Sequence, residues 1–272
     1  MDEPGSSQWL ARARQGDAQA FRHLVQPHLQ RLHKLAVRML GNPDDAQEVV
    51  QESLLRASNG LDGFREDAQF GTWLYSITTR QCLNALRARK RWRWDALRDL
   101  PVAAQEAVHR DPASPAFDPS FVFDAHQHIA FCFTCVGRSL EPEQQVALVL
   151  RDVLGLSNAE AATHAGVSQS VLRHRLSDAR KHMQRSFDGL CAIVAKQGIC
   201  YQCSGLRGTF PVEQRGPEVP QLGTEGDGDE ERYRHRLNVV SSADLEGGSS
   251  ARLHELLFRV MGDHETGNSA NR

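Results

Sequence analysis

Apolar residues in the first part of the chain recur at steps of three and four, and this spacing restricts that part to amphipathic helices. The run from Trp9 to Leu40 shows the period, although a proline interrupts it. Asn42, followed by proline and two acids, is a favourable start for a second helix. A third run covers residues 70–92. Residues 9–94 are therefore predicted to form one all-helical domain.

Changes in composition divide the rest of the chain. Residues 95–120 hold four prolines among small and polar residues, which is typical of an exposed, flexible linker. Helical spacing resumes over residues 121–187, followed by a Cys-rich segment at residues 188–204. Residues 205–272 have too few apolar residues to offset the entropy of ordering, so they are predicted to be largely disordered, with a short amphipathic helix near residues 251–261. The sequence thus predicts an all-α fold of two helical domains on a flexible linker.

Charge is distributed unevenly along the chain. A formal net charge of −2 argues against bulk coating of nucleic acid. Basic residues nevertheless gather in two blocks, at Arg87, Arg89, Lys90, Arg91 and Arg93, and at Arg173, Arg175, Arg180, Lys181 and Arg185. No stretch approaches the ~20 apolar residues that cross a bilayer, and the acidic start lacks the apolar core of a secretion signal. We expect a cytoplasmic protein with no membrane partner.

The second helical domain contains the spacing of a helix-turn-helix. Ser157 and Glu160 form a capping box at the start of the first helix. Ala162, Gly166 and Leu172 supply the small residue at the crossing, the turn glycine and the apolar residue of the second helix. Ser168 caps this second helix, which projects outward the side chains Gln169, Ser170, Arg173, His174 and Arg175.

These outward side chains suit the edges of DNA bases, because arginine pairs with guanine and glutamine with adenine in the major groove. Val171, Leu172 and Leu176 are expected to face inward. The alternative is an ordinary helical hairpin whose basic face is simply solvated.

Residues 43–57, residues 70–77 and the pair of segments at residues 140–144 and 167–180 form three motifs that, in this order, resemble the extracytoplasmic-function (ECF) sigma factors of bacterial RNA polymerase. Residues 43–57 resemble the region 2 helix of that family, and residues 70–77 resemble the segment that follows it. Residues 140–144 and 167–180 resemble region 4, so that the resemblance spans about residues 9–187. It implies a non-enzymatic subunit that binds core RNA polymerase and directs transcription initiation at particular promoters.

The resemblance also implies roles for individual residues. The acidic helix would dock on the clamp helices of the polymerase β′ subunit through Asp45, Glu48, Gln51 and Glu52. The third helix would engage the −10 element of promoter DNA through Arg80, Asn84, Arg87, Arg89, Lys90 and Arg91. Region 4 would contact the β flap and place Arg173 and Arg175 near the −35 element. An anti-sigma protein is a further candidate partner, although no pattern in the sequence points to one.

Some features leave alternatives open. The acidic face could be merely solvated, and Trp73 could be either a core residue or a platform for stacked bases. Arg80 stands where many members of the family carry asparagine, and Asp178 stands where arginine is common. These two departures put the promoter sequence in doubt, but not the class of protein.

Six cysteines in a reducing compartment favour metal or redox chemistry over structural disulfides. Two Cys-x-x-Cys pairs could supply the four thiolates of a tetrahedral zinc site. The first pair is Cys132 and Cys135, and the second is Cys200 and Cys203. Cys191 is an alternative ligand. The arrangement resembles ECF sigma factors with a Cys-rich C-terminal extension, some of which sense metal ions. Redox sensing and simple burial are the alternatives, and Cys82 is expected to be a core residue.

Two other functions remain to be weighed against a sigma factor. A conventional helix-turn-helix regulator would bind duplex DNA without polymerase, but it leaves the acidic helix unexplained. A thiol oxidoreductase would need a Cys-x-x-Cys pair in a βαβ setting, which neither pair has.

Overall fold

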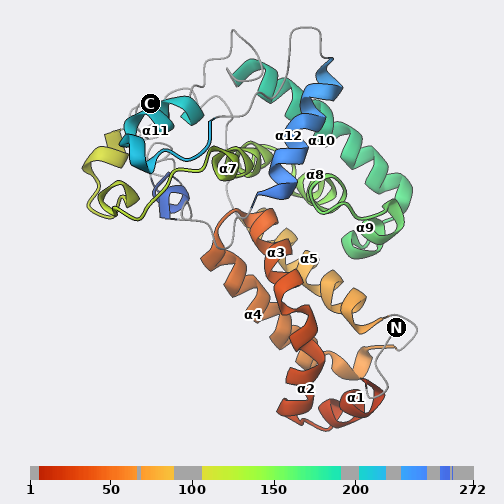
Figure 1. Ribbon diagram of the computed structural model, residues 1–272. Helices are drawn as coiled ribbons and strands as arrows, with labels where there is room; N and C mark the ends of the chain where they lie inside the picture. Colours follow the sequence, from red (N-terminus) through yellow and green to blue (C-terminus); the bar gives the residue numbers. More distant parts are fainter. Residues whose placement is uncertain are drawn as a thin grey trace, which may run out of the picture. The chain divides into compact units, whose positions relative to one another are not determined.

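The computed structural model is helical in both of its parts (Figure 1). It describes residues 6–65, 69–88, 106–190, 202–218, 228–243, 252–257 and 259. Among these residues there are helices and an isolated β-bridge between Phe123 and Arg215, but no strand, which confirms the all-α prediction. Contacts group the chain into unit 1, which is Met1–Lys90 with Pro142–Leu176, and unit 2, which is Arg91–Glu141 with Ser177–Arg272.

Unit 1 is built around three helices that lie side by side, α3, α4 and α5 (Figure 1). Its N-terminal elements are α1 (Ser6–Arg14), α2 (Ala18–Val25), the 3-10 turn η1 (Gln26–His28), α3 (Leu29–Leu40), α4 (Pro43–Asn59), the 3-10 turn η2 (Leu61–Gly63) and α5 (Phe70–Ala88). Its later elements are α8 (Pro142–Leu148), the π-helical turn η5 (Val149–Val153), α9 (Asn158–Ala165) and the start of α10 (Gln169–Leu190).

Local chemistry sets the helix ends of unit 1. Gly41 ends α3 in the left-handed conformation, with φ of 73°. The Asn42 side chain then accepts hydrogen bonds from the backbone N–H groups of Asp44 and Asp45, which caps α4 as predicted. Ala46 and Val50 turn inward from α4 and join a core that includes fully buried leucines of α3. This packing leaves the acidic side of α4 facing outward.

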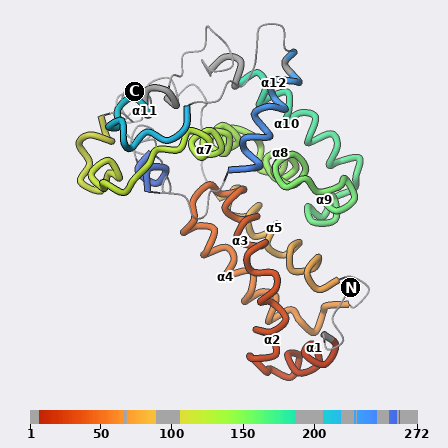
Figure 2. The backbone as a smooth tube through the Cα atoms, viewed as in Figure 1, coloured from red at the N-terminus to blue at the C-terminus, as the bar shows by residue number. Residues whose placement is uncertain are grey.

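Unit 2 is centred on α7 (Ala125–Gly137), which packs against both α11 (Gln202–Thr209) and α12 (Asp229–Ser242), as the tube in Figure 2 also shows. Its other described elements are the 3-10 turns η4 (Pro115–Phe117) and η6 (Val212–Gln214) and short helices at residues 106–110 and 252–257. Phe121, Phe123 and Phe210 are fully buried in its core.

The division of the chain differs from the one that the sequence predicts. Composition predicts an exposed linker at residues 95–120, whereas the structure buries Val108 and Ser114 in unit 2. The C-terminal segment supplies Leu253 and Leu257 to the same hydrophobic cluster, and α12 also lies in that segment. The α8 and α9 helices group with α5 rather than with α7. Apolar contacts made across long stretches of sequence account for these differences.

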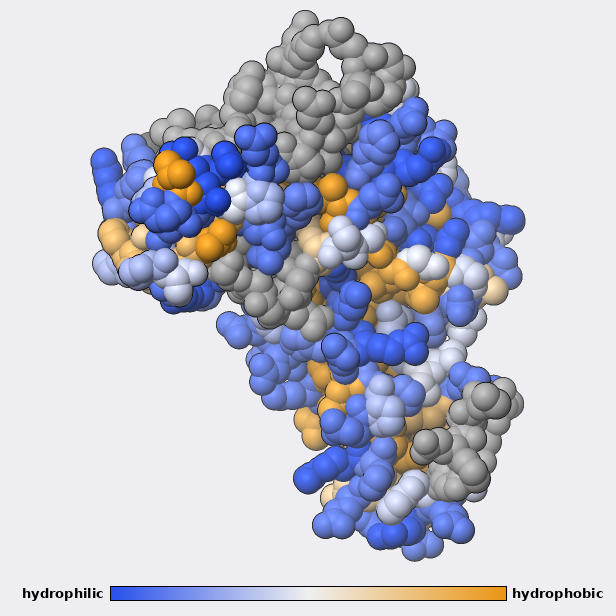
Figure 3. All heavy atoms as spheres, viewed as in Figure 1, coloured by the Kyte–Doolittle hydropathy of each residue, from blue (hydrophilic) through white to orange (hydrophobic). Residues whose placement is uncertain are grey.

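The described surface is largely polar. In the view of Figure 3, hydrophilic side chains cover most of the coloured face, and the apolar patches between them are small. Among the described residues, no helix combines the length and the apolar character that crossing a membrane requires.

Candidate nucleic-acid interface

The acidic helix α4 presents the predicted polymerase-binding residues on its outer side. Glu48, Gln51 and Glu52 are exposed, while Asp45 is half-buried next to the helix N-cap. Glu52 accepts a 2.7 Å hydrogen bond from the Arg56 guanidinium one turn later. These side chains share one side of α4 because its buried residues occupy the opposite side. The exposed acidic side of α4 can therefore contact a partner while the helix stays folded.

The helix α5 separates a packed face from a basic face. Leu74, Cys82 and Leu86 are buried, so Cys82 is the core residue that the sequence predicts. Arg80 and Arg87 are exposed on the other side. Asn84 is exposed between them, so the three predicted DNA contacts follow one another at helical spacing. Arg89, Lys90 and Arg91, the remaining predicted contacts of this helix, lie outside the described residues.

Trp73 lies at the start of α5 and packs within an aromatic cluster. Its ring centroid lies 5.0 Å from that of Phe64 and 5.7 Å from that of Phe70. Leu10 and Leu61 are buried in the same hydrophobic cluster. These contacts favour a core role for Trp73 over a stacking platform.

The basic face of α5 meets the helices α8 and α9. The Arg87 guanidinium donates two hydrogen bonds, of 3.0 and 2.6 Å, to the Glu143 carboxylate at the start of α8. Partial burial alone would raise the pKa of Glu143, but hydrogen bonding and charge from Arg87 outweigh it and lower that pKa. The Gln145 amide, which is buried, donates a 2.9 Å hydrogen bond to the backbone carbonyl of Met39. These contacts join α8 to α5 and to α3. We call them, together with the contacts of His164 described below, the α5–α9 seam.

His164 brings α9 onto α5. Its Nδ1 lies 3.2 Å from the Ser76 hydroxyl, and its ring centroid lies 4.6 Å from that of Tyr75. Burial lowers the pKa of His164, so the imidazole is neutral in the seam. Burial also raises the pKa of Tyr75 to about 12, which keeps its phenol neutral. His164 and Tyr75 therefore add no charge to the seam.

A cavity of about 320 Å³ lies along this seam. Arg80, Asn84 and Arg87 of α5 line it, and Arg175 of α10 lines it from the other side. Predicted DNA contacts of both sequence regions therefore meet around one basic cavity. The sequence alone gave no sign of this meeting, because the residues are about 90 positions apart.

The helix-turn-helix has the local geometry that the sequence predicts. The Ser157 hydroxyl accepts a hydrogen bond from the Glu160 N–H, and the Glu160 carboxylate accepts one from the Ser157 N–H. Gly166 takes the left-handed conformation at the turn, with φ of 66°. The Ser168 hydroxyl accepts a hydrogen bond from the Val171 N–H, which caps α10. The first helix therefore begins and ends where expected, and the second begins where expected.

The recognition helix α10 exposes most of the predicted base contacts. Ser168, Gln169, Ser170, Arg173 and His174 are exposed, and Arg175 is half-buried at the cavity. Leu172 and Leu176 face inward as predicted, but the inward prediction for Val171 is wrong, since Val171 is 42% exposed. One residue of helix turns the side chain by about 100°, so Val171 leaves the buried stripe that Leu172 occupies.

The first cysteine pair lies on α7. Cys135 is buried, which raises the pKa of its thiol, and Cys132 is half-buried. Cys191, Cys200 and the side chain of Cys203 lie outside the described residues, and no group of three or more metal-binding side chains occurs among the residues that are described. The zinc site stays a prediction.

Sequence reasoning missed Ser76, Glu143, Gln145 and His164, which hold the seam. Glu143 belongs to the segment at residues 140–144 that resembles region 4, and Gln145 follows it directly, but their partners Arg87 and Met39 lie 56 and 106 residues away. A signal within a few residues of each position could not identify these partners.

Known proteins resemble this chain over both regions. Residues 24–92 match the family described as Sigma-70 region 2, and residues 132–183 match Sigma-70, region 4. The ECF RNA polymerase sigma factor SigG of Mycobacterium tuberculosis is 32% identical over 189 residues, which cover 63% of this chain and 49% of that protein. The chain thus spans about half the length of SigG.

Two shorter relatives are covered more completely. The ECF RNA polymerase sigma factor SigM of Mycobacterium tuberculosis is 30% identical over 183 residues, covering 67% of this chain and 85% of that protein. The RNA polymerase sigma factor NccH of Alcaligenes xylosoxydans xylosoxydans is 31% identical over 182 residues, covering 66% and 94%.

Proposed function

Because the chain belongs to the family of ECF RNA polymerase sigma factors, we propose that it binds core RNA polymerase and directs transcription initiation at particular promoters. In this proposal the chain is a regulatory subunit and not an enzyme. The observation that carries it is the pairing of two surfaces in one chain, an exposed acidic side of α4 and exposed arginines on α5 and α10. A conventional DNA-binding regulator needs only the second of these surfaces.

The acidic side of α4 supports the polymerase contact. Glu48, Gln51 and Glu52 point outward from a helix whose other side is anchored in the core of unit 1. An acidic surface on a rigid helix favours fast, oriented binding to a basic partner. We assign these residues, with Asp45, to the clamp helices of the β′ subunit.

The arginines support two contacts with promoter DNA. Arg173 and the neighbouring side chains of α10 are exposed for the −35 duplex, as in other helix-turn-helix proteins. Arg80, Asn84 and Arg87 are assigned to the −10 element. Since Arg87 is bonded to Glu143 in the seam, binding of the −10 element by α5 requires α8 and α9 to move away.

Run-off transcription with purified core polymerase tests the proposal. The full chain should initiate from its promoter without any other factor, whereas a conventional regulator would bind duplex DNA and give no transcript. Reversing the charge of α4 with Glu48→Lys and Glu52→Lys should reduce the transcript about tenfold, as expected for ~1.4 kcal/mol of lost binding. Two lysines placed at Glu213 and Glu218, which are exposed in unit 2, are the matched control.

The cysteines support control by a metal ion or by redox state as a finer part of the proposal. The helix α11 contains Cys203 and packs against α7, where Cys132 and Cys135 lie. Leu206 of α11 shares a buried cluster with Cys135. The packing of these two helices favours a site made from both cysteine pairs, with zinc as the preferred ion.

Metal analysis of the full chain purified under reducing conditions tests this part. We expect one zinc ion per chain, lost in Cys132→Ser and kept in Cys82→Ala, because Cys82 is a core residue of unit 1. A chain that holds no zinc but forms a disulfide under mild oxidation would favour redox control. A chain that does neither would leave the cysteines as packing residues.

A further inference from the structure

The C-terminal extension contains a short helix that packs on the segment between the two sigma regions. Residues 252–257 are helical, and Leu253, Leu256 and Leu257 are buried. They join one cluster with Val108 and Phe121, which come from the segment that composition assigns to a linker. This contact gives the extension a defined place in unit 2.

Two ion pairs fix the ends of this helix to the same segment. The Arg252 guanidinium lies 2.5 Å from the Asp118 carboxylate, and the Arg259 guanidinium lies 3.3 Å from that of Asp111. The arginines are seven residues apart, as are the two aspartates. This matched spacing holds the helix along the segment in one register.

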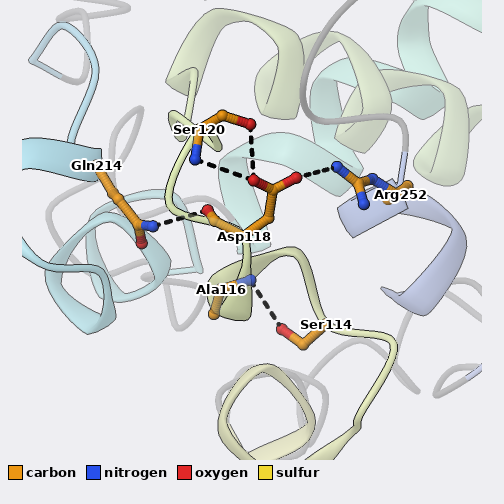
Figure 4. A network of polar contacts seen from close by, with 6 residues as sticks. All are labelled: Ser114, Ala116, Asp118, Ser120, Gln214 and Arg252. Atoms are coloured by element: carbon orange, nitrogen blue, oxygen red, sulfur yellow. Dashed lines mark hydrogen bonds and ion pairs between the residues drawn. The ribbon is translucent and has the colours of Figure 1, made fainter.

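Asp118 is at the centre of a wider network (Figure 4). One oxygen of its carboxylate accepts hydrogen bonds from the N–H and the hydroxyl of Ser120, and its backbone carbonyl accepts one from the Gln214 amide. Hydrogen bonds from Ser120 and Arg252 lower the pKa of Asp118 to about 2. The ion pair with Arg252 is therefore charged at any pH between 5 and 8.

His254 lies between these ion pairs and faces the interior. It is 7% exposed, and its ring stacks on Phe131 at 4.2 Å with an angle of 5° between the planes. Its centroid lies 5.8 Å from that of His128 on α7. The Nε2 atom of His254 has no hydrogen-bond partner among the described residues. A neutral imidazole fits this apolar position, but a charged one does not.

We propose that the helix at residues 252–257 is an acid-releasable clip, which packs on the segment between the sigma regions until His254 takes up a proton. Among the described residues, His128 on α7 lies beside the ring, and two ion pairs, Arg252 with Asp118 and Arg259 with Asp111, flank it along the helix. Both aspartates are bound to the arginines, so they do not offset a charge on His254. The nearest of the other groups, His128, would repel it.

The consequence that we propose for the clip depends on the proposed sigma-factor function. With the clip closed, residues 106–124 belong to folded unit 2. Release would loosen at most residues 106–117, or up to roughly 40 Å at 3.3–3.6 Å per residue, because Asp118 and Phe123 stay bonded to Gln214 and Gly216. A sigma factor that must place its two regions on separate promoter elements would gain reach from this change.

The direction of the pH effect follows from the burial of His254. Burial, with a smaller contribution from His128, lowers its pKa well below 6.5 in the docked state. The docked helix therefore binds fewer protons than the released helix, and docking weakens as pH falls below 6.5. Between pH 7.5 and pH 5.5 one such group changes the docking equilibrium about tenfold.

Hydrogen-exchange protection factors of residues 252–257, which are corrected for intrinsic exchange, test the clip in the full chain without polymerase. Protection should fall about tenfold from pH 7.5 to pH 5.5 and should be independent of pH in His254→Phe, which keeps the stack on Phe131. His109→Phe, the same change at an exposed histidine of unit 2, should keep the tenfold fall. Asp118→Asn should lower protection equally at both pH values.

Three outcomes would overturn the clip. The first is a pH-dependent fall in protection that persists in His254→Phe, even if this fall disappears when His128 is also replaced. The second is an equal loss of protection in α7, which would mean that the whole of unit 2 opens. The third is wild-type protection that does not change with pH. None of these outcomes depends on polymerase binding, so a failed clip and a failed sigma assignment are distinguishable.

Discussion

The α5–α9 seam of unit 1 and the extension contact of unit 2 both join segments that lie far apart in the chain, yet different forces hold them. The seam relies on hydrogen bonds and an ion pair, such as Arg87 with Glu143 and Gln145 with the Met39 carbonyl. The extension contact is mainly a cluster of buried apolar side chains, which includes Phe123 and Phe210. Polar groups exchange protein partners for water or DNA at small net cost, whereas apolar side chains do not.

This difference suits the two contacts to different roles. A polar seam can open when DNA phosphates replace Glu143 as the partner of Arg87. An apolar cluster stays closed unless a specific change, such as a proton on His254, disfavours it. The three predictions below test this contrast by measuring how much each contact contributes to stability.

Phe210→Ala should have the largest effect. The Phe210 ring is 1% exposed and lies 5.1 Å from that of Phe121 and 5.6 Å from that of Phe123. Removing it leaves a cavity in the cluster and should lower the free energy of unfolding of unit 2 by about 3–5 kcal/mol in urea denaturation. Val212→Ala, two residues away but 74% exposed, should change it by less than ~0.5 kcal/mol. Equal effects of the two variants would refute an apolar extension contact.

Gln145→Ala should have an intermediate effect. It leaves the buried Met39 carbonyl without this donor, which should cost unit 1 about 1–3 kcal/mol in the same denaturation measurement. The matched control is Gln47→Ala on the exposed side of α4, which should be nearly neutral. A loss as large as that of Phe210→Ala would show that the seam is no weaker than the apolar cluster.

Glu143→Gln should have the smallest effect. The Arg87 partner is more than half exposed, so the ion pair should contribute at most ~1 kcal/mol to the stability of unit 1. The pKa of Glu143 is lowered in the folded chain, so this contribution is complete above pH 4.5 and is lost as pH falls below that value. Unfolding in urea at pH 7 and pH 3.5 measures both. The control is Glu106→Gln, because Glu106 forms an exposed pair with Arg110. If Glu143→Gln changed the free energy of unfolding equally at pH 3.5 and pH 7, that result would contradict the ion pair.

Features set by neighbouring residues could be predicted from the sequence. Asn42 caps α4, Ser157 and Glu160 form the capping box, and Gly166 makes the turn, because each depends on contacts within four residues. The helical period likewise placed Cys82 and Leu172 in the core. Local chemistry therefore gave the helices and the side of each that carries candidate binding residues.

Features set by distant residues could not be predicted in this way. The helix α12 was not predicted, because average composition hides the seven-residue step between its buried Tyr233 and Val240. The burial of Val108 depends on Leu253 and its neighbours, which lie more than 140 residues further along. The cavity lined by Arg80 and Arg175 depends in the same way on how α5 packs against α9.

The junction of the extension with the body of unit 2 has a consequence for its tolerance of mutation. The N–H of Gly216 donates a 2.9 Å hydrogen bond to the Phe123 carbonyl, and a Cβ at position 216 would collide with that same oxygen. A single added methyl group would thus detach the backbone at this point while leaving every promoter-reading residue of α5 and α10 unchanged. The single substitution Gly216→Ala should therefore separate docking of the C-terminal extension from DNA recognition, so that the two can be tested independently.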